Sequence, residues 1–187
     1  MKIWILLLLL MSSCMVRDNP YDPKCDPNSF DSSKTGEKAV CISSPIFGAY
    51  SVYDGASFSA SGNSDSIPNL NETIRMDVSF KNTAVASLPG ITGKLSTTST
   101  LATIDVQNAT KTYGDTPAGW YNSPGGTWSS TASAKTYLTA ASVNAFRIII
   151  PSTTANNSTI PLVLTLTDSG NNKWILNFNM TIGQAPP

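Results

Sequence analysis

A period-two alternation of apolar and polar residues is the strongest pattern in the chain. Residues 74–80 read Ile-Arg-Met-Asp-Val-Ser-Phe, so every second side chain falls on one face of a predicted strand. Residues 146–150 and 162–167 are predicted to be further strands, and residues 174–182 alternate in the same way. The two faces predicted to be buried consist of Ile74, Met76, Val78 and Phe80, and of Trp174, Leu176, Phe178, Met180 and Ile182.

Turn-forming residues separate these runs, and no stretch shows an extended helical period. Residues 168–172, Asp-Ser-Gly-Asn-Asn, form a turn cluster of hairpin length between the last two predicted strands. Short strands divided by turns, with a polar face on the clearest ones, are typical of an antiparallel β-sandwich. Charged residues make up only 13% of the chain, which is typical of an exported β-rich protein. We therefore expect an all-β domain over residues 40–187.

The first thirteen residues have the layout of a secretory signal. Lys2 supplies a positive charge, residues 3–11 are an unbroken apolar run, and Ser12 and Ser13 are the small residues that a signal peptidase accepts. The apolar run is too short to cross a hydrocarbon core, which requires roughly 20 helical residues. We interpret residues 1–13 as a signal peptide that is cleaved.

The residue after this segment is a cysteine, and Met-Ser-Ser-Cys at 11–14 resembles the bacterial lipobox. Met11 stands where the pattern prefers Leu, a relaxation tolerated in spirochaetes and some other diderm bacteria. The resemblance implies that the Cys14 thiol becomes a diacylglyceryl thioether and that its amine is acylated, for example by palmitate. Two or three acyl chains, at about 0.8 kcal/mol per buried CH₂, form a lasting membrane anchor. The alternative is an ordinary secretory signal that happens to be followed by a cysteine.

Residues 14–39 are expected to form an irregular tether between the acylated N-terminus and the domain. They contain few large apolar residues and several Pro-containing turns, so they cannot bury enough surface to offset their chain entropy. Residues 18–23, Asp-Asn-Pro-Tyr-Asp-Pro, resemble the leader that follows the lipid cysteine in many bacterial surface lipoproteins. The neighbouring aspartates lack the spacing of a cation-binding loop, and we interpret them as a solvated turn cluster. Met15 follows Cys14 where an inner-membrane lipoprotein of enteric bacteria has aspartate, which implies an outer-membrane location in the cell envelope.

The other two cysteines are an even pair in an oxidising compartment. A bridge between Cys25 and Cys41 would close a loop of about 15 residues and stabilise the fold by roughly 3 kcal/mol. We predict that it fastens the tether to the first strand, and the alternative is that both thiols stay free. Zinc is not expected, because the chain has no histidine and only these two thiols remain.

Residues 70–83 resemble the second strand of bacterial cell-adhesion-related and similar immunoglobulin-like domains. In that family a Leu-x-x-Gly-Glu-like turn leads into a strand that ends in a Val-x-x-x-Asn-x-Gly signature. This chain has Asn71 where the family favours Gly, and Ala84 near a position where a second Gly is common. Residues 113–115, Tyr-Gly-Asp, and the terminal hairpin fit the same pattern. The resemblance implies an immunoglobulin-like β-sandwich over residues 67–182, and fold alone does not specify function.

Composition limits the chemistry that the chain can perform. Without histidine, Ser-His-Asp and Cys-His arrangements are impossible, and a carboxylate pair is the one hydrolytic alternative left open. We expect no enzymatic activity, no cofactor and no metal. One of the 12 basic residues is Lys2, in the predicted signal peptide, so the mature chain carries one fewer basic than acidic residue. A near-neutral chain without a basic stripe is not expected to bind nucleic acid.

Residues 119–128, Gly-Trp-Tyr-Asn-Ser-Pro-Gly-Gly-Thr-Trp, are the candidate ligand-binding segment. Trp120, Tyr121 and Trp128 could stack on sugars or anchor a protein partner, because aromatic rings give large contact area at low entropy cost. The alternative is that Trp120 and Trp128 fold back to plug one end of the sandwich. We expect a lipid-anchored surface protein that displays a non-catalytic β-sandwich for adhesion or protein interaction. The second hypothesis is a carbohydrate-binding module that uses the three aromatic residues.

Overall fold

The computed structural model describes residues 45–55, 62–84, 86–130 and 144–186. The predicted signal peptide, tether and anchor, with Cys14, Cys25 and Cys41, lie outside the described residues. In the described ranges, regular structure consists of ten strands and one short 3-10 helix. No helix in these ranges is long and apolar enough to cross a membrane.

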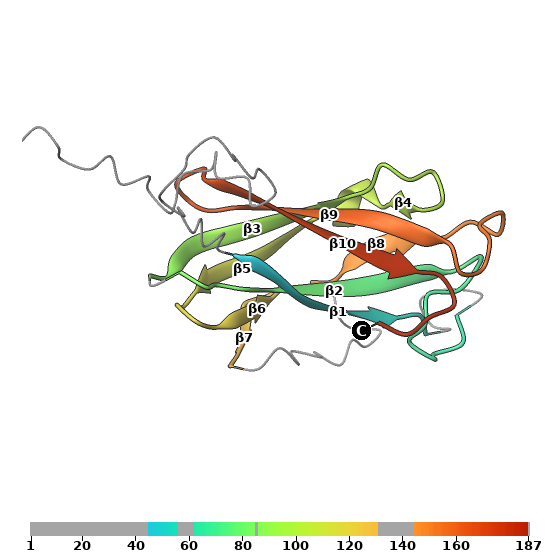
Figure 1. Cartoon of the computed structure of the whole chain (residues 1–187), viewed down its shortest axis with the longest axis horizontal. Coiled ribbons are helices and arrows are strands. Elements are labelled where there is room, and N and C mark those ends of the chain that lie inside the picture. The colour runs from blue at the N-terminus through green and yellow to red at the C-terminus, as the bar shows by residue number, and fades with distance from the viewer. Residues whose placement is uncertain (1–44, 56–61, 85, 131–143, 187) are drawn as a thin grey trace, which may run out of the picture.

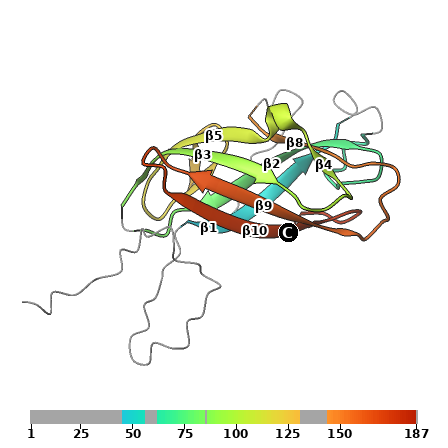
Figure 2. The same ribbon diagram turned by 90° about the horizontal axis from the view of Figure 1, so that it is seen from above.

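Two antiparallel sheets pack face to face (Figures 1 and 2). The first sheet has the order β4-β8-β2-β6-β7, and β1 pairs with the other side of β2. The second has the order β10-β9-β3-β5. The strands of the first sheet are β1 (Ile46–Tyr53), β2 (Thr73–Lys81), β4 (Thr103–Ile104), β6 (Tyr121–Ser123), β7 (Thr127–Ser129) and β8 (Phe146–Ile149). Those of the second are β3 (Leu88–Ser96), β5 (Thr110–Thr116), β9 (Thr159–Thr167) and β10 (Lys173–Thr181), and the 3-10 helix η1 spans Val106–Asn108. The predicted all-β, antiparallel sandwich is confirmed.

The strand order is that of an immunoglobulin-like sandwich. Neighbours β1-β2-β8 in one sheet and β3-β9-β10 in the other correspond to strands A-B-E and C-F-G of that fold. The first sheet departs from the pattern at β2, because β8 pairs only with its first half, Thr73–Met76. The hairpin of β6 and β7 instead pairs with its last two residues, Phe80 and Lys81. The hairpin therefore extends the sheet at one end of the domain.

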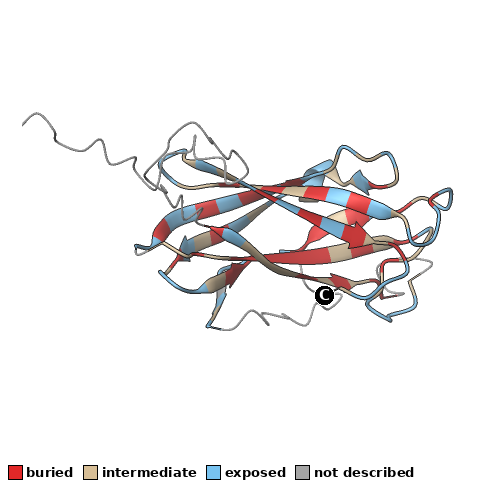
Figure 3. Ribbon diagram, viewed as in Figure 1, coloured by how far each residue is buried: buried red, intermediate tan, exposed pale blue. Residues whose placement is uncertain are grey.

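The core follows the alternation of the sequence (Figure 3). The predicted inward face of β2 is fully buried, and on β10 and just after it the predicted face is buried except for Trp174, which is half-buried and packs against the core. The turn at 168–172 joins β9 to β10 as predicted, with Thr167 opposite Lys173. Phe47 of β1 stacks on Phe178 of β10 with ring centroids 4.8 Å apart, so the edges of the two sheets meet. The residues of the buried core are Tyr50, Val52, Ile74, Met76, Val78, Phe80, Leu88, Ile91, Leu95, Ala102, Tyr113, Phe146, Ile148, Ile150, Ile160, Leu162, Leu164, Leu166, Leu176, Phe178, Met180 and Ile182.

The outer face of β2 is also covered, which the alternation did not predict. Asp77 and Ser79 occupy polar positions of the alternating run, yet they are only 4% and 2% exposed. The Ser79 hydroxyl accepts a hydrogen bond from the Ala49 N–H at 3.0 Å and donates one to the Ala49 carbonyl at 3.1 Å. This double contact lies at an irregularity in the pairing of β1 with β2, between Phe47 and Tyr50. A polar residue on this face thus binds the neighbouring strand instead of water.

Candidate functional site

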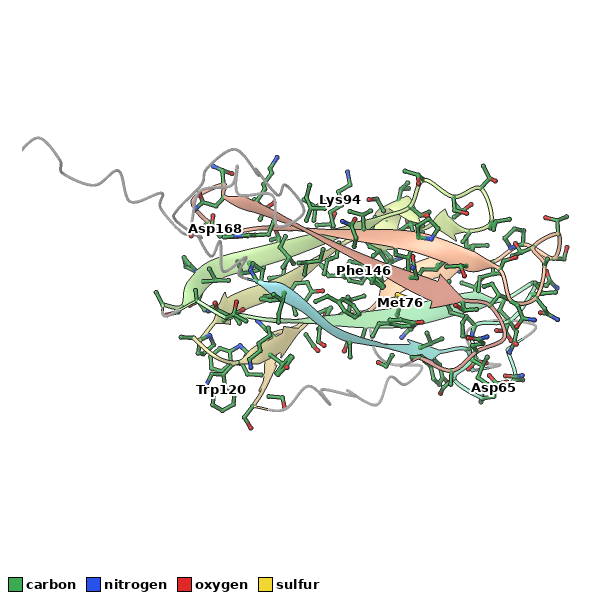
Figure 4. The ribbon with its side chains drawn as sticks, viewed as in Figure 1. Asp65, Met76, Lys94, Trp120, Phe146 and Asp168 are labelled. Carbon is green, nitrogen blue, oxygen red and sulfur yellow. The ribbon has the colours of Figure 1, made fainter. Side chains whose placement is uncertain are left out.

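The aromatic segment lies at the end of β2, on the β6–β7 hairpin and the turn that precedes it (Figure 4). Trp120 and Trp128 are 41% and 50% exposed. Both indoles therefore face solvent over much of their surface, which argues against the alternative in which they plug the end of the sandwich. Tyr121 is half-buried.

Two glycines close the hairpin between its strands. Gly125 and Gly126 have φ of 92° and 78°, a backbone region that side-chain-bearing residues rarely adopt. The Gly126 N–H donates to the Ser123 carbonyl at 3.1 Å, and the Gly125 N–H donates to the Thr112 carbonyl of β5 at 2.7 Å. The tip of the hairpin is thereby tied to the opposite sheet, which fixes the strand that carries Trp128.

Asn82, directly after β2, holds the turn that carries Trp120. Its backbone N–H donates to the Trp120 carbonyl at 2.9 Å, and its own carbonyl accepts from the Gly119 N–H at 2.8 Å. Its side-chain amide donates to the carbonyls of Thr116 and Ala86, at 3.0 and 2.8 Å. Because Asn82 is fully buried, these bonds are shielded from water and position the Trp120 backbone firmly.

A second buried amide joins the hairpin to the other sheet. The Asn122 side chain donates to the Tyr113 carbonyl at 3.0 Å and to the Thr116 hydroxyl at 2.7 Å. The Tyr113 hydroxyl in turn donates to the Val78 carbonyl at 2.6 Å. Burial raises the pKa of Tyr113 well above its ordinary value, and the charge of Asp77 raises it further, so this hydroxyl remains a donor at neutral pH. The hairpin is thus pre-organised by neutral hydrogen-bonding groups.

Tyr121 does not share a face of the hairpin with Trp128. It lies opposite Lys81 on β2, whose ammonium nitrogen is 5.2 Å from the centroid of the phenol ring. A Cβ added to Gly48 of β1 would meet the edge of that ring at 3.0 Å, so the ring lies against the outer face of the sheet. Trp128 lies opposite Asn122, and adjacent positions of a strand point to opposite faces. Tyr121 and Trp128 therefore lie on different faces of the hairpin.

A second group of polar residues, which the sequence pattern did not indicate, lies at the other end of β2. Asp54 follows β1, Asp65 lies in the next loop and Glu72 directly precedes β2. Asp54 and Glu72 are 0% and 2% exposed, whereas Asp65 is exposed. As the side chains lie, no three His, Cys, Asp or Glu residues among the described ones are arranged to hold a metal ion.

Hydrogen bonds from the loop orient these carboxylates. The Ser66 N–H donates to Asp54 Oδ1 at 3.1 Å, the Ile67 N–H to Asp65 Oδ1 at 2.7 Å, and the Asn69 N–H to Glu72 Oε2 at 2.8 Å. Burial raises the pKa of Glu72. The Asn69 N–H opposes this shift, while the charges of Asp54 and Asp65 add to it.

The pKa of Asp65 shifts in the opposite direction. Burial raises its pKa, but the hydrogen bonds from the Ile67 N–H and from the Asn63 and Asn69 side chains outweigh that effect and leave the pKa lowered. Asp65 is therefore ionised at neutral pH. Its carboxylate is within hydrogen-bonding reach of the Asp54 carboxyl group.

Neither a protein-family model nor a curated protein sequence matches this chain. A proposal for its function therefore rests on the sequence and on the geometry of the described residues.

Proposed function

We propose that this protein is a lipid-anchored, extracytoplasmic surface protein whose non-catalytic β-sandwich acts in adhesion or protein interaction. The observation that carries the proposal is that two exposed indoles, Trp128 on a hydrogen-bonded hairpin and Trp120 on the turn before it, are held by a fixed backbone. Tryptophan is enriched among the residues that dominate binding energy at protein interfaces. The proposed anchor at Cys14 rests on the lipobox-like sequence at residues 11–14.

Pre-organisation supports a binding role for the hairpin. Asn82 fixes the Trp120 turn, and the Asn122 amide and the Thr112 carbonyl fix the rest of the hairpin against β5. A partner that docks on the indoles would not have to order this backbone, so less of the contact energy would be lost to conformational entropy.

The arrangement favours a protein partner over a sugar. A flat carbohydrate platform requires several rings on one face, and Tyr121 lies on the opposite face of the hairpin from Trp128. The Lys81 ammonium also covers part of the Tyr121 ring. The carbohydrate-binding alternative is therefore left with the two tryptophans alone.

The anchor is tested by replacing Cys14 with serine. We expect Cys14→Ser to lose fatty-acid labelling and to move into the aqueous phase on detergent phase partitioning, because acyl chains supply the membrane affinity. Unchanged membrane association of Cys14→Ser, with the signal peptide still cleaved, would contradict the anchor.

The binding role is tested by removing both indoles. Beads coated with the full-length Trp120→Ala/Trp128→Ala protein should attach to cell-envelope and host-cell surfaces at least tenfold less than wild-type beads, since such anchors are worth about 2 kcal/mol or more each. Ile175→Ala is the matched control, because Ile175 is 61% exposed on β10, outside the hairpin. Equal attachment of the double variant would refute the role. Quenching of wild-type tryptophan fluorescence by polysaccharides, lost in the double variant, would instead favour the carbohydrate hypothesis.

A further inference from the structure

The carboxylates at the Thr73 end of β2 form a second candidate site, which is separate from the aromatic hairpin. We propose that Asp54 and Asp65 bind a divalent cation of the calcium type, together with water and neutral oxygen atoms of residues 62–72. Glu72 supplies a third negative charge beside this site. Figure 4 shows Asp65 at the opposite end of the molecule from Trp120.

The first supporting observation is an unpartnered buried oxygen. Asp54 is fully buried, and its Oδ1 accepts from the Ser66 N–H, but no hydrogen-bond donor reaches its Oδ2. No lysine or arginine forms an ion pair with Asp54, Asp65 or Glu72 in the part of the chain that the structure describes. A buried carboxylate with one hydrogen bond and no counter-ion is strongly disfavoured unless a proton or a cation neutralises it.

The second observation is that the Asp65 carboxylate faces this buried group. The Ser66 N–H that donates to Asp54 Oδ1 at 3.1 Å belongs to the residue directly after Asp65, and the two side chains are in contact. Two carboxylates in contact repel each other unless a proton or a cation lies between them. A cation between them would neutralise both carboxylates at neutral pH, and neither would have to bind a proton.

The surrounding atoms fit calcium better than other metals. The Asn63 amide nitrogen donates to Asp65 Oδ2 at 2.8 Å, and the Asn69 amide nitrogen lies 3.3 Å from the same oxygen. The Asn63 Oδ1 also accepts from the Asp65 N–H at 3.1 Å, and the Asn69 amide nitrogen also donates to the Ile67 carbonyl at 3.1 Å, so both amides are held as donors. Water and backbone carbonyl oxygens, and not these amides, would complete the coordination. Carboxylate and carbonyl oxygens, with water, are the ligands of calcium, which accepts flexible sets of six to eight. The residues that the structure describes include neither histidine nor cysteine, the ligands that a softer metal prefers.

The proposed coordination uses two carboxylates and not three. No three acidic groups of the described ranges converge as they stand, so Glu72 contributes charge while its Oε2 stays on the Asn69 N–H. A site with few charged ligands binds weakly, with a dissociation constant on the order of 10⁻⁴–10⁻³ M, as in extracellular calcium modules. Such an affinity suits a protein exposed to external calcium.

Thermal unfolding of the full-length protein in detergent tests the proposal. Addition of 5 mM (~10 Kd) CaCl₂ to protein held in EDTA should raise the midpoint by about 3–6 °C, and the same concentration of MgCl₂ should raise it less. Asp54→Asn should abolish the calcium-dependent rise, and in EDTA its midpoint should equal or exceed that of the wild type, because the like-charge contact is gone. Asp115→Asn is the matched control, since Asp115 is exposed and its Oδ1 only accepts from the Gly90 N–H. It should keep the full rise.

Two results would overturn the proposal. One is a wild-type midpoint that does not respond to calcium but rises on acidification, which would identify a proton as the shared partner of Asp54 and Asp65. The other is a full calcium response in Asp54→Asn. If Asp54→Asn does not fold, the exposed Asp65→Asn takes its place, and calorimetric titration with CaCl₂ should show one bound ion in the wild type and none in that variant.

Discussion

The two ends of β2 solve the burial of polar groups in different ways. At the Lys81 end, the buried groups are neutral amides: Asn82 and Asn122 donate to carbonyl and hydroxyl oxygens and fix an exposed aromatic hairpin. At the Thr73 end, the buried groups are acids, and Asp54 and Glu72 have no cationic partner among the described residues. Both ends leave an oxygen without a donor, namely Asn122 Oδ1 and Asp54 Oδ2.

The two unpartnered oxygens differ in the free energy that their burial costs. A neutral buried oxygen without a donor costs about 1–3 kcal/mol, which a well-packed domain can absorb, whereas an uncompensated carboxylate costs considerably more. The amide end is therefore stable without a ligand, and the surface that it exposes for contact is apolar. The acidic end is incomplete without a ligand. One end is suited to present a contact surface, and the other to take up a cation.

Converting the amide end into a copy of the acidic end should have the largest effect. In Asn122→Asp, a carboxylate oxygen replaces the amide nitrogen that donates to the Tyr113 carbonyl and the Thr116 hydroxyl. We expect a loss of about 3–5 kcal/mol in the free energy of unfolding at pH 7, because a charge is buried against an acceptor. Urea denaturation measures this loss.

Acid should relieve that loss, because burial would raise the pKa of the new carboxyl group and the protonated form can donate again. Asn177→Asp is the control, since Asn177 is exposed on β10 and should change stability by less than about 0.5 kcal/mol. A loss no greater than that of the control would contradict the contrast between the two ends.

Removing one hydroxyl from the amide end should have an intermediate effect. Tyr113→Phe deletes the donor to the Val78 carbonyl, a 2.6 Å bond between the two sheets in a fully buried site. We expect a loss of about 1–2 kcal/mol, the cost of leaving a buried carbonyl without its partner. Tyr121→Phe removes the same atom from a half-buried ring and should be nearly neutral. Equal losses in the two variants would show that the bond to Val78 contributes nothing specific.

The fold was largely predictable from the sequence because local alternation sets the buried faces of the longest strands. The run at 74–80 and the run after Lys173 give their inward faces directly, and the turn at 168–172 joins its strands as predicted. β3 was not predicted, because Pro89, Gly90 and Gly93 break the pattern. Gly93 is required there by a distant residue, since a Cβ on it would lie 2.6 Å from the Tyr113 ring.

The candidate sites were predictable only in part. The aromatic segment was identified from its composition, but sequence could not decide between exposed and plugging tryptophans, because that depends on how the hairpin docks on β2 and β5. Asp54, Asp65 and Glu72 were not identified as a group, because they are separated in sequence and meet only when β1 pairs with β2. The density of Asn and Asp in residues 63–72 was the one available signal.

The smallest effect is expected from a pH comparison at the acidic end. Burial, together with the charges of Asp54 and Asp65, raises the pKa of Glu72 above its ordinary value of 4.5. The native protein therefore takes up a proton at Glu72 before the unfolded chain does, so stability increases as the pH falls from 7 toward 4.5 and this gain is complete below that value. The pKa of Asp65 is lowered, so its contribution to stability is lost only below the ordinary value of 3.8, and the two pH windows are separate.

Glu72→Gln keeps an oxygen for the Asn69 N–H but cannot titrate, and in EDTA its stability should increase less than that of the wild type as the pH falls from 7 toward 4.5. Urea denaturation at pH 7 and pH 5 measures the difference, and parallel pH profiles for the two proteins would mean that folding does not raise the pKa of Glu72.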